Sequence, residues 1–217
     1  MITALSQKTT KKIAARGSIL QPLLIIFWIT WLFFFLTAKD PTDWWIENIL
    51  VFLFFGWLFT MRKKIKFTDG AMVCILLFLT LHIYGARMAY THNELGEYLK
   101  NRFHLWRNPY DRIVHFSFGF LLLYPFNELL SKKFSGQRNF GLLLSNMAIL
   151  CLATIFELIE WGVAACTDKA TGETYVATQG DLWDSQKDIF VAIVGALLFT
   201  LIFSILREKR ATISDTK

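Results

Sequence analysis

Long apolar blocks separated by short polar gaps dominate the pattern of the chain. The first block, 19–38, contains no charged residue and has roughly the 20 residues that a helix needs to cross the hydrocarbon core of a bilayer. A signal peptide is the alternative because basic residues precede this block, but the block is too long and no cleavage site of small residues follows it. The pattern therefore predicts that the first block stays attached as a membrane-spanning helix.

Five more apolar blocks follow along the chain. The fourth of the six begins with Asn108 and Pro109, a capping residue followed by a proline that suits the first helical position. The approximate bounds of the five blocks are 44–61, 70–90, 108–130, 140–165 and 184–206. The sequence thus predicts an all-α, polytopic membrane protein built as a bundle of six transmembrane helices.

The composition supports this class of protein. Hydrophobic residues make up 54% of the 217 residues, charged residues only 18%, and the mean hydropathy is +0.42. Such a chain has more apolar surface than one soluble core could bury, which excludes an ordinary soluble domain. The low counts of glycine and proline, 12 and 4, exclude a disordered or collagen-like chain. Short alternating segments are absent from the sequence, which argues against a membrane barrel.

Positive charges follow an alternating distribution that predicts the orientation. Cytoplasmic loops retain lysine and arginine. The N-terminus, the gaps after the second and fourth helices and the C-terminal tail are basic, whereas the other three gaps are acidic or mixed. We therefore expect a cytoplasmic segment at 1–18, a single transmembrane domain at 19–206 and a cytoplasmic tail at 207–217. The net charge of +6 follows from the same rule and indicates no nucleic-acid partner.

Ionisable residues in or beside the apolar blocks are candidates for function, because charges are costly in lipid. Asp111 and His115 are four residues apart in the fourth helix, and Glu157 and Glu160 are three residues apart in the fifth. Each spacing places both side chains on one face of a helix. Two carboxylates one turn apart in apolar surroundings repel each other unless a cation, a proton or an arginine compensates them.

More polar residues occur at the start of the sixth helix and the end of the third. Asp181, Asp184 and Asp188 follow an i, i+3, i+7 spacing, and His82 and Arg87 come late in the third block. In the predicted orientation the third and fifth helices run outward and the fourth and sixth run inward, so these residues and the two pairs above share one level. We expect one outward-facing acidic and histidine site formed by four helices.

Structural roles are the alternative for several of these residues. His115 could be a core histidine with satisfied hydrogen bonds, and Arg87 or Arg112 could neutralise a carboxylate on a neighbouring helix. Glu47 is expected at the membrane interface, without a role in the site. The residues that also suit a helix cap or the helix dipole are Asp111, Asp181 and Asp184.

Three segments of the chain match a known pattern: YDRIVHF at 110–116, FELIEW at 156–161 and QGDLWDSQKD at 179–188. At these separations they resemble the YjdF family of bacterial inner-membrane proteins, whose biochemical function is not established. The resemblance covers most of the chain and implies a multi-pass protein of the bacterial inner membrane. It implies no reaction.

A more distant similarity is to VanZ-like proteins, which are associated with glycopeptide-antibiotic resistance. Their pattern has an Asp-basic-x-x-His-Phe helix, a later helix with Glu, and a last helix with an Asp seven residues before a Gly. Ala192 replaces an Asn that is usual there, and an Arg expected before the last helix has no clear counterpart, so resistance activity is not implied. The residues that fit the pattern are Asp111, His115, Glu157, Asp188 and Gly195.

The first functional hypothesis is a membrane-embedded hydrolase or transferase that uses a divalent metal, Zn, Mn, Mg or Ca, and acts on an envelope lipid or lipid-linked substrate. Carboxylate and imidazole ligands suit these ions, and a bound ion can lower the pKa of water to near neutral. The expected catalytic set is Glu160 as a base, Asp184, and Arg87 or Arg112 as a clamp for an anionic group. The expected metal ligands are Asp111, His115, Glu157 and Asp188, with His82 and Asp181 as further candidates.

Two other functions stay open at this point. The same acids and histidines could carry protons or bind a cationic solute in a transport protein. Against transport, the acids gather at one level, and internal repeats are not apparent in the sequence. The third hypothesis is a non-catalytic subunit of an envelope complex, in which the acids only fix helix packing.

Overall fold

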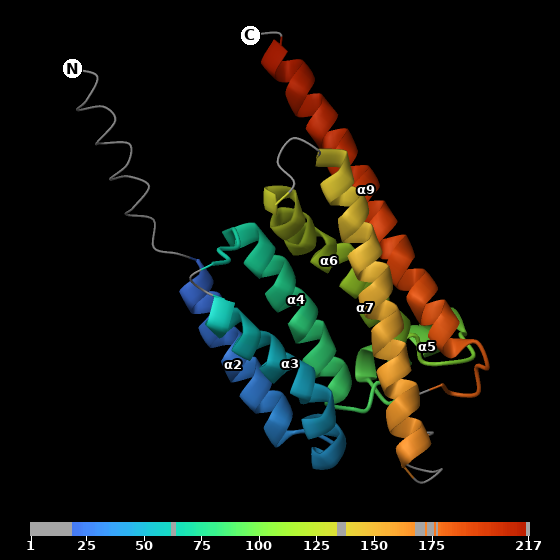
Figure 1. The fold of residues 1–217 in the computed structure, drawn as a ribbon. Helices are drawn as coiled ribbons and strands as arrows, with labels where there is room; N and C mark the ends of the chain where they lie inside the picture. The colour runs from blue at the N-terminus through green and yellow to red at the C-terminus, as the bar shows by residue number, and fades with distance from the viewer. Residues whose placement is uncertain are drawn as a thin grey trace.

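The structure is a computed structural model that describes residues 19–61, 64–133, 138–167 and 178–215, together with Gly172 and Val176. Within this part of the chain, the regular secondary structure is helical, as Figure 1 shows. The helices are α2 (Leu20–Leu36), α3 (Pro41–Met61), α4 (Asp69–Ala86), α5 (Glu94–Phe103), α6 (Tyr110–Lys133), α7 (Arg138–Cys166) and α9 (Asp184–Asp215). The predicted segment 1–18 lies outside the described residues.

Five of these helices, α3, α4, α6, α7 and α9, are long and apolar enough to cross a membrane. The sixth apolar helix, α2, has 17 residues and is about 26 Å long at 1.5 Å per residue, which is close to the lower limit for a span. Each helix coincides with one of the predicted apolar blocks. The prediction of an all-α polytopic bundle is therefore confirmed.

Two helix ends differ from the prediction by four residues or more. The third block ends at Ala86 instead of 90, because Ala89 and Tyr90 have positive φ and turn the chain. The last helix continues past 206 to Asp215, because the charged residues after the apolar block are good helix formers and extend it beyond the hydropathy signal.

The helix α5 was not predicted. It lies in the polar segment between α4 and α6, and Asn93 caps it by accepting a hydrogen bond from the Gly96 backbone N–H at 3.2 Å. Its hydrophobic residues lie on one face, so it has the amphipathic pattern of a helix at a surface or membrane interface. It is too short and too polar to appear among the apolar blocks from which the sequence predicts membrane-spanning helices.

The bundle has two halves. Figure 1 shows α2, α3 and α4 on one side and α6, α7 and α9 on the other, with α4 packed against α6 between them. Aromatic rings fill the first half, where the Trp31 indole N–H also donates to the Asn48 amide oxygen at 2.7 Å. The end of the bundle where α6 and α9 begin and where α4 and α7 end is called the site end below.

The closest helix contact joins α6 and α9. A Cβ added to Gly119 would lie 1.8 Å from the Ala192 carbonyl oxygen, and one added to Gly195 would lie 2.3 Å from the Phe116 carbonyl oxygen. Only glycine lets the two backbones approach so closely. One turn nearer the site end, this contact brings His115 of α6 next to Asp188 of α9.

Candidate functional site

A hydrogen-bonded junction fixes the start of α6. The Asn108 side-chain oxygen accepts from the Tyr110 backbone N–H at 3.0 Å, while its amide nitrogen donates to the Asn93 carbonyl at 3.1 Å. The Asn108 backbone N–H donates to the Gln179 side-chain oxygen at 2.9 Å, and the Gln179 side-chain nitrogen donates back to the Asn108 carbonyl at 3.1 Å. These bonds connect the starts of α5 and α6 to the segment before α9, so they align the polar residues of α6 and α9.

Two arginines bridge these helix starts. Arg112 of α6 pairs with Asp184 and Asp188 of α9, and Arg107 pairs with Asp184. Arg107 also lies 3.6 Å from the Asp111 carboxylate. Arg107 is only 6% exposed, so its charge requires these partners. Arg112 was a predicted site residue, whereas Arg107 was not.

Asp181 lies at the edge of this arginine network. Its carboxylate accepts hydrogen bonds from the Lys187 ammonium at 2.7 Å and from the Trp183 backbone N–H at 3.1 Å, and it lies 3.3 Å from Arg112. The Lys187 hydrogen bond holds the pKa of Asp181 below its ordinary value. These are the capping and pairing contacts that the structural alternative predicts for Asp181.

Asp111, His115, Glu157 and Asp188 converge from α6, α7 and α9, and are called the His115 group below. The His115 Nε2 atom lies 3.5 Å from an Asp111 oxygen and 3.4 Å from Glu157 Oε1. One ligand atom each of Asp111, His115 and Asp188 lies within 4.8 Å of the others. The structure thus brings together the four residues that the sequence predicted as principal metal ligands.

Two carboxylate oxygens of the His115 group have no hydrogen-bond partner among the described residues: Glu157 Oε1 and Asp188 Oδ1. Glu157 is 5% exposed and Asp188 is 2% exposed. A buried acceptor without a partner costs roughly 1–3 kcal/mol, and more when it is charged. Both oxygens therefore leave room for a further donor, which a proton, a water molecule or a cation would supply.

The excess of acidic groups extends beyond these four residues. Glu160 and Glu47 lie close enough to Asp111 for their charges to interact. Glu47 was expected at the membrane interface, but it is buried at 9% exposure because its side of α3 faces α4. In the described part of the chain, the acids of this region outnumber the basic side chains that pair with them, which are Arg107, Arg112 and Lys187.

His82, a further predicted ligand, is not part of the His115 group. Its Nε2 lies 3.1 Å from the Glu47 carbonyl oxygen and its Nδ1 lies 2.7 Å from the Tyr90 hydroxyl. Because a carbonyl only accepts, Nε2 carries the hydrogen and Nδ1 accepts from Tyr90. Both ring nitrogens are therefore used within the protein, and His82 connects α4 to α3 and to the loop after α4.

Arg87, predicted as an anion clamp, is also apart from the His115 group. Its guanidinium donates to the Thr37 hydroxyl and to the Glu94 carboxylate, each at 2.9 Å. Among the predicted clamp residues, Arg112 alone contacts a member of the His115 group.

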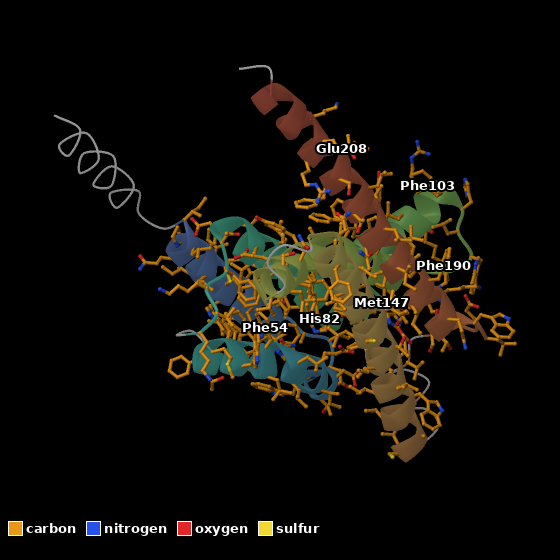
Figure 2. All side chains as sticks on the ribbon, turned by 45° about the horizontal axis from the view of Figure 1, so that its top comes forward. Phe54, His82, Phe103, Met147, Phe190 and Glu208 are labelled. Atoms are coloured by element: carbon orange, nitrogen blue, oxygen red, sulfur yellow. The ribbon has the colours of Figure 1, made fainter. Side chains whose placement is uncertain are left out.

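A cavity of about 520 Å³ lies beside the His115 group, between α3, α4, α6 and α7. Asp111, His115 and Glu160 line its site end, and apolar side chains line most of the rest. Figure 2 shows Phe54 and His82, two lining residues, in the interior of the bundle, whereas Phe103 and Phe190 point outward. The polar group thus faces a largely apolar cavity.

Sequence reasoning missed Arg107, Asn108 and Gln179 as parts of the site. The spacing of Arg107 and Asp111, four residues apart, was a usable signal for an ion pair. The pairing of Asn108 with Gln179 spans 71 positions, and no local spacing predicts such a contact.

Apolar helices that bury an acidic and histidine group at one end define an integral, polytopic membrane protein. The family model described as "Predicted membrane protein (DUF2238)" matches residues 19–209, and the chain belongs to this family. It is similar to the inner membrane protein YjdF of Escherichia coli (strain K12), with 29% identity over 170 residues, which cover 77% of this chain and 80% of that protein.

These comparisons confirm the resemblance to the YjdF family and the assignment to the inner membrane as a multi-pass protein. They do not show the VanZ-like similarity. No solved structure matches the chain significantly. The family establishes a membrane protein, and the similarity to YjdF supports the inner membrane, whereas neither comparison shows a reaction.

Proposed function

We propose that the chain is a metal-dependent hydrolase or transferase that acts on a lipid or lipid-linked substrate at the outward-facing side of the inner membrane. The observation that carries the proposal is the convergence of Asp111, His115 and Asp188 within 4.8 Å, next to two buried carboxylate oxygens without a partner in the described residues. A divalent cation would satisfy both oxygens and offset the excess of acids.

The ligand set favours particular ions. Asp111, Asp188 and Glu157 supply carboxylate oxygens, and His115 supplies an imidazole nitrogen. Mg and Ca prefer sites built from oxygen alone, whereas Zn and Mn accept imidazole together with carboxylates. We therefore rank Zn and Mn above Mg and Ca. Arg112 pairs with Asp188 and would orient this ligand.

The remaining polar groups have roles that suit hydrolysis or group transfer. When bound, the metal would supply an acidified water and polarise a phosphoryl or acyl oxygen. Glu160 lines the cavity one turn beyond Glu157 and would accept the proton of the attacking water or hydroxyl. Asp184 holds both Arg107 and Arg112, so it would position the donors that face an anionic group.

Proton-linked transport is the competing function, because protons could also satisfy the buried oxygens. A transport pathway needs polar groups across the bilayer. The cavity wall away from the site end is instead formed by apolar residues, among them Phe54, Trp57, Phe126 and Leu129. This polarity difference favours chemistry at one interface over passage through the bundle.

The test uses the full-length protein in vesicles of phosphatidylethanolamine and phosphatidylglycerol. The lipids are analysed by mass spectrometry after incubation with Zn²⁺, with Mn²⁺ or with a chelator. We expect a product that forms only with a metal and that disappears in Glu157→Gln. Glu94→Gln, which removes an acid at the same end of the bundle but in contact with Arg87, is the matched control and should stay active. A metal-independent product, or proton flux that Asp188→Asn abolishes, would contradict the proposal.

A further inference from the structure

The cavity beside the His115 group extends along α6. Its lining on α6 runs from Asp111 to Leu129, which corresponds to about 27 Å at 1.5 Å per residue. Its volume is about 520 Å³. The cavity is called the slot below.

The slot changes in polarity along its length. At the site end, Asp111, His115 and Glu160 face it. At the opposite end, its walls include Trp57 of α3 and Leu129 of α6. The ligand that matches this gradient has a polar or charged head and a hydrocarbon tail.

The slot also opens to the side. Several lining residues of α3 and α7 are exposed, and α3 and α7 are not among the helix pairs with extensive contacts in the described part of the chain. A molecule dissolved in the bilayer can therefore reach the slot without passing through water. The residues that both line the slot and are exposed are Leu50 (40%), Trp57 (38%), Leu152 (38%), Ile155 (50%) and Ile159 (45%).

We propose that the slot binds one hydrocarbon chain of a bilayer lipid, which enters between α3 and α7 and places the lipid headgroup at the His115 group. This proposal extends the proposed function, and it rests on that function only for the reaction of the headgroup. It specifies the substrate as a lipid whose tail stays inside the protein at the level of the hydrocarbon core. A headgroup with a phosphate or ester oxygen suits the cation proposed above.

Photocrosslinking tests this placement without any catalysis. The full-length protein is reconstituted in vesicles of phosphatidylethanolamine and phosphatidylglycerol that contain a phosphatidylethanolamine with a diazirine at the end of one acyl chain. After illumination, mass spectrometry identifies the labelled residues. We expect adducts on the walls farthest from the His115 group, at Trp57, Phe126 or Leu129. Adducts confined to lipid-facing residues outside the slot, such as Leu143 (53% exposed), would overturn the proposal.

Variants separate the slot from the general lipid surface. Leu122→Trp fills the slot and should reduce slot labelling several-fold, whereas Leu143→Trp adds the same ring outside the slot and should leave it unchanged. If Leu122→Trp does not fold, Leu50→Trp at the exposed mouth of the slot replaces it. Unchanged labelling in the folded slot variant would also overturn the proposal.

The lipid slot and the proposed metal chemistry can be rejected independently of each other. Tail binding depends on the apolar walls and needs no metal, so labelling in the slot should persist in the presence of a chelator. Slot labelling in a protein that binds no metal would reject the proposed chemistry and keep the lipid slot. Metal binding without slot labelling would reject the slot and keep the metal site.

Discussion

Two buried histidines at the same end of the bundle differ in the atoms that surround them. His82 of α4 has one ring nitrogen on the Glu47 carbonyl and the other on the Tyr90 hydroxyl. His115 of α6 directs Nε2 toward the carboxylates of Asp111 and Glu157. Both side chains are less than 10% exposed, so burial does not distinguish them.

The difference lies in what each set of partners requires. A carbonyl and a hydroxyl complete the hydrogen bonds of a neutral imidazole, so the surroundings of His82 are satisfied without a ligand. Two carboxylate oxygens around His115 lack a partner in the described residues, so this region, unlike that of His82, has acceptors that a cation, a proton or a water molecule would satisfy. The region around His82 is therefore a packing element, and the region around His115 is a candidate binding site.

The largest expected effect comes from Arg112. Arg112→Met leaves Asp184 and Asp188 without this partner, and we expect a loss of about 3–5 kcal/mol because a buried charge loses its compensation. Thermal unfolding in detergent measures the loss. Arg112→Lys should recover only part of it, because lysine cannot reproduce the forked contact. A fully stable Arg112→Met protein would contradict the central role of this network.

The second-largest loss of stability is expected at the α6–α9 contact. Gly119→Val places a side chain against the Ala192 carbonyl, and we expect a loss of about 1–3 kcal/mol in unfolding free energy together with weaker metal binding. Gly162→Val is the control, because a Cβ at Gly162 meets nothing within 4 Å. Metal titration and thermal unfolding report the two effects. Metal affinity equal to wild type in Gly119→Val would show that this contact does not position Asp188.

A substitution in the region around His82 should lower stability without changing metal binding. Tyr90→Phe removes the hydroxyl that donates to His82 Nδ1, and we expect a loss of about 1 kcal/mol without any change in bound metal. Elemental analysis and thermal unfolding of the same preparation check both parts. Loss of metal in Tyr90→Phe would remove the distinction between the two histidines.

The smallest effect is expected at the Arg87–Glu94 pair. Its two side chains are 20% and 50% exposed, and exposed ion pairs contribute little, so Arg87→Met should cost less than about 1 kcal/mol. A loss comparable with that of Arg112→Met would show that Arg87 has a structural role beyond this surface pair.

The helices and the position of the His115 group were predictable because both follow from local pattern. Apolar length determines the spans, and the four-residue spacing of Asp111 and His115 places them on one helix face. Because successive spans cross the membrane in opposite directions, the end of α7 and the start of α9 lie at the same level, which brings Glu157 and Asp188 to the level of this pair.

The roles of other residues depend on contacts that local pattern does not contain. His82 is satisfied by Tyr90, which reaches it through a loop with positive φ. Glu47 was assigned to the interface from its place near a helix start, but its side of α3 packs toward α4. Long-range contacts of this kind decide which of several buried ionisable residues forms a site.

Elemental analysis of the detergent-purified protein shows whether His115 binds a metal, with wild type, His115→Ala and His82→Gln prepared side by side. We expect a stoichiometric divalent metal, Zn or Mn, in wild type and His82→Gln, and a content reduced by more than about tenfold in His115→Ala, because a proposed ligand is lost. No metal in folded wild-type protein, or equal metal in both variants, would contradict the claim that His115 forms a metal site and His82 a packing contact.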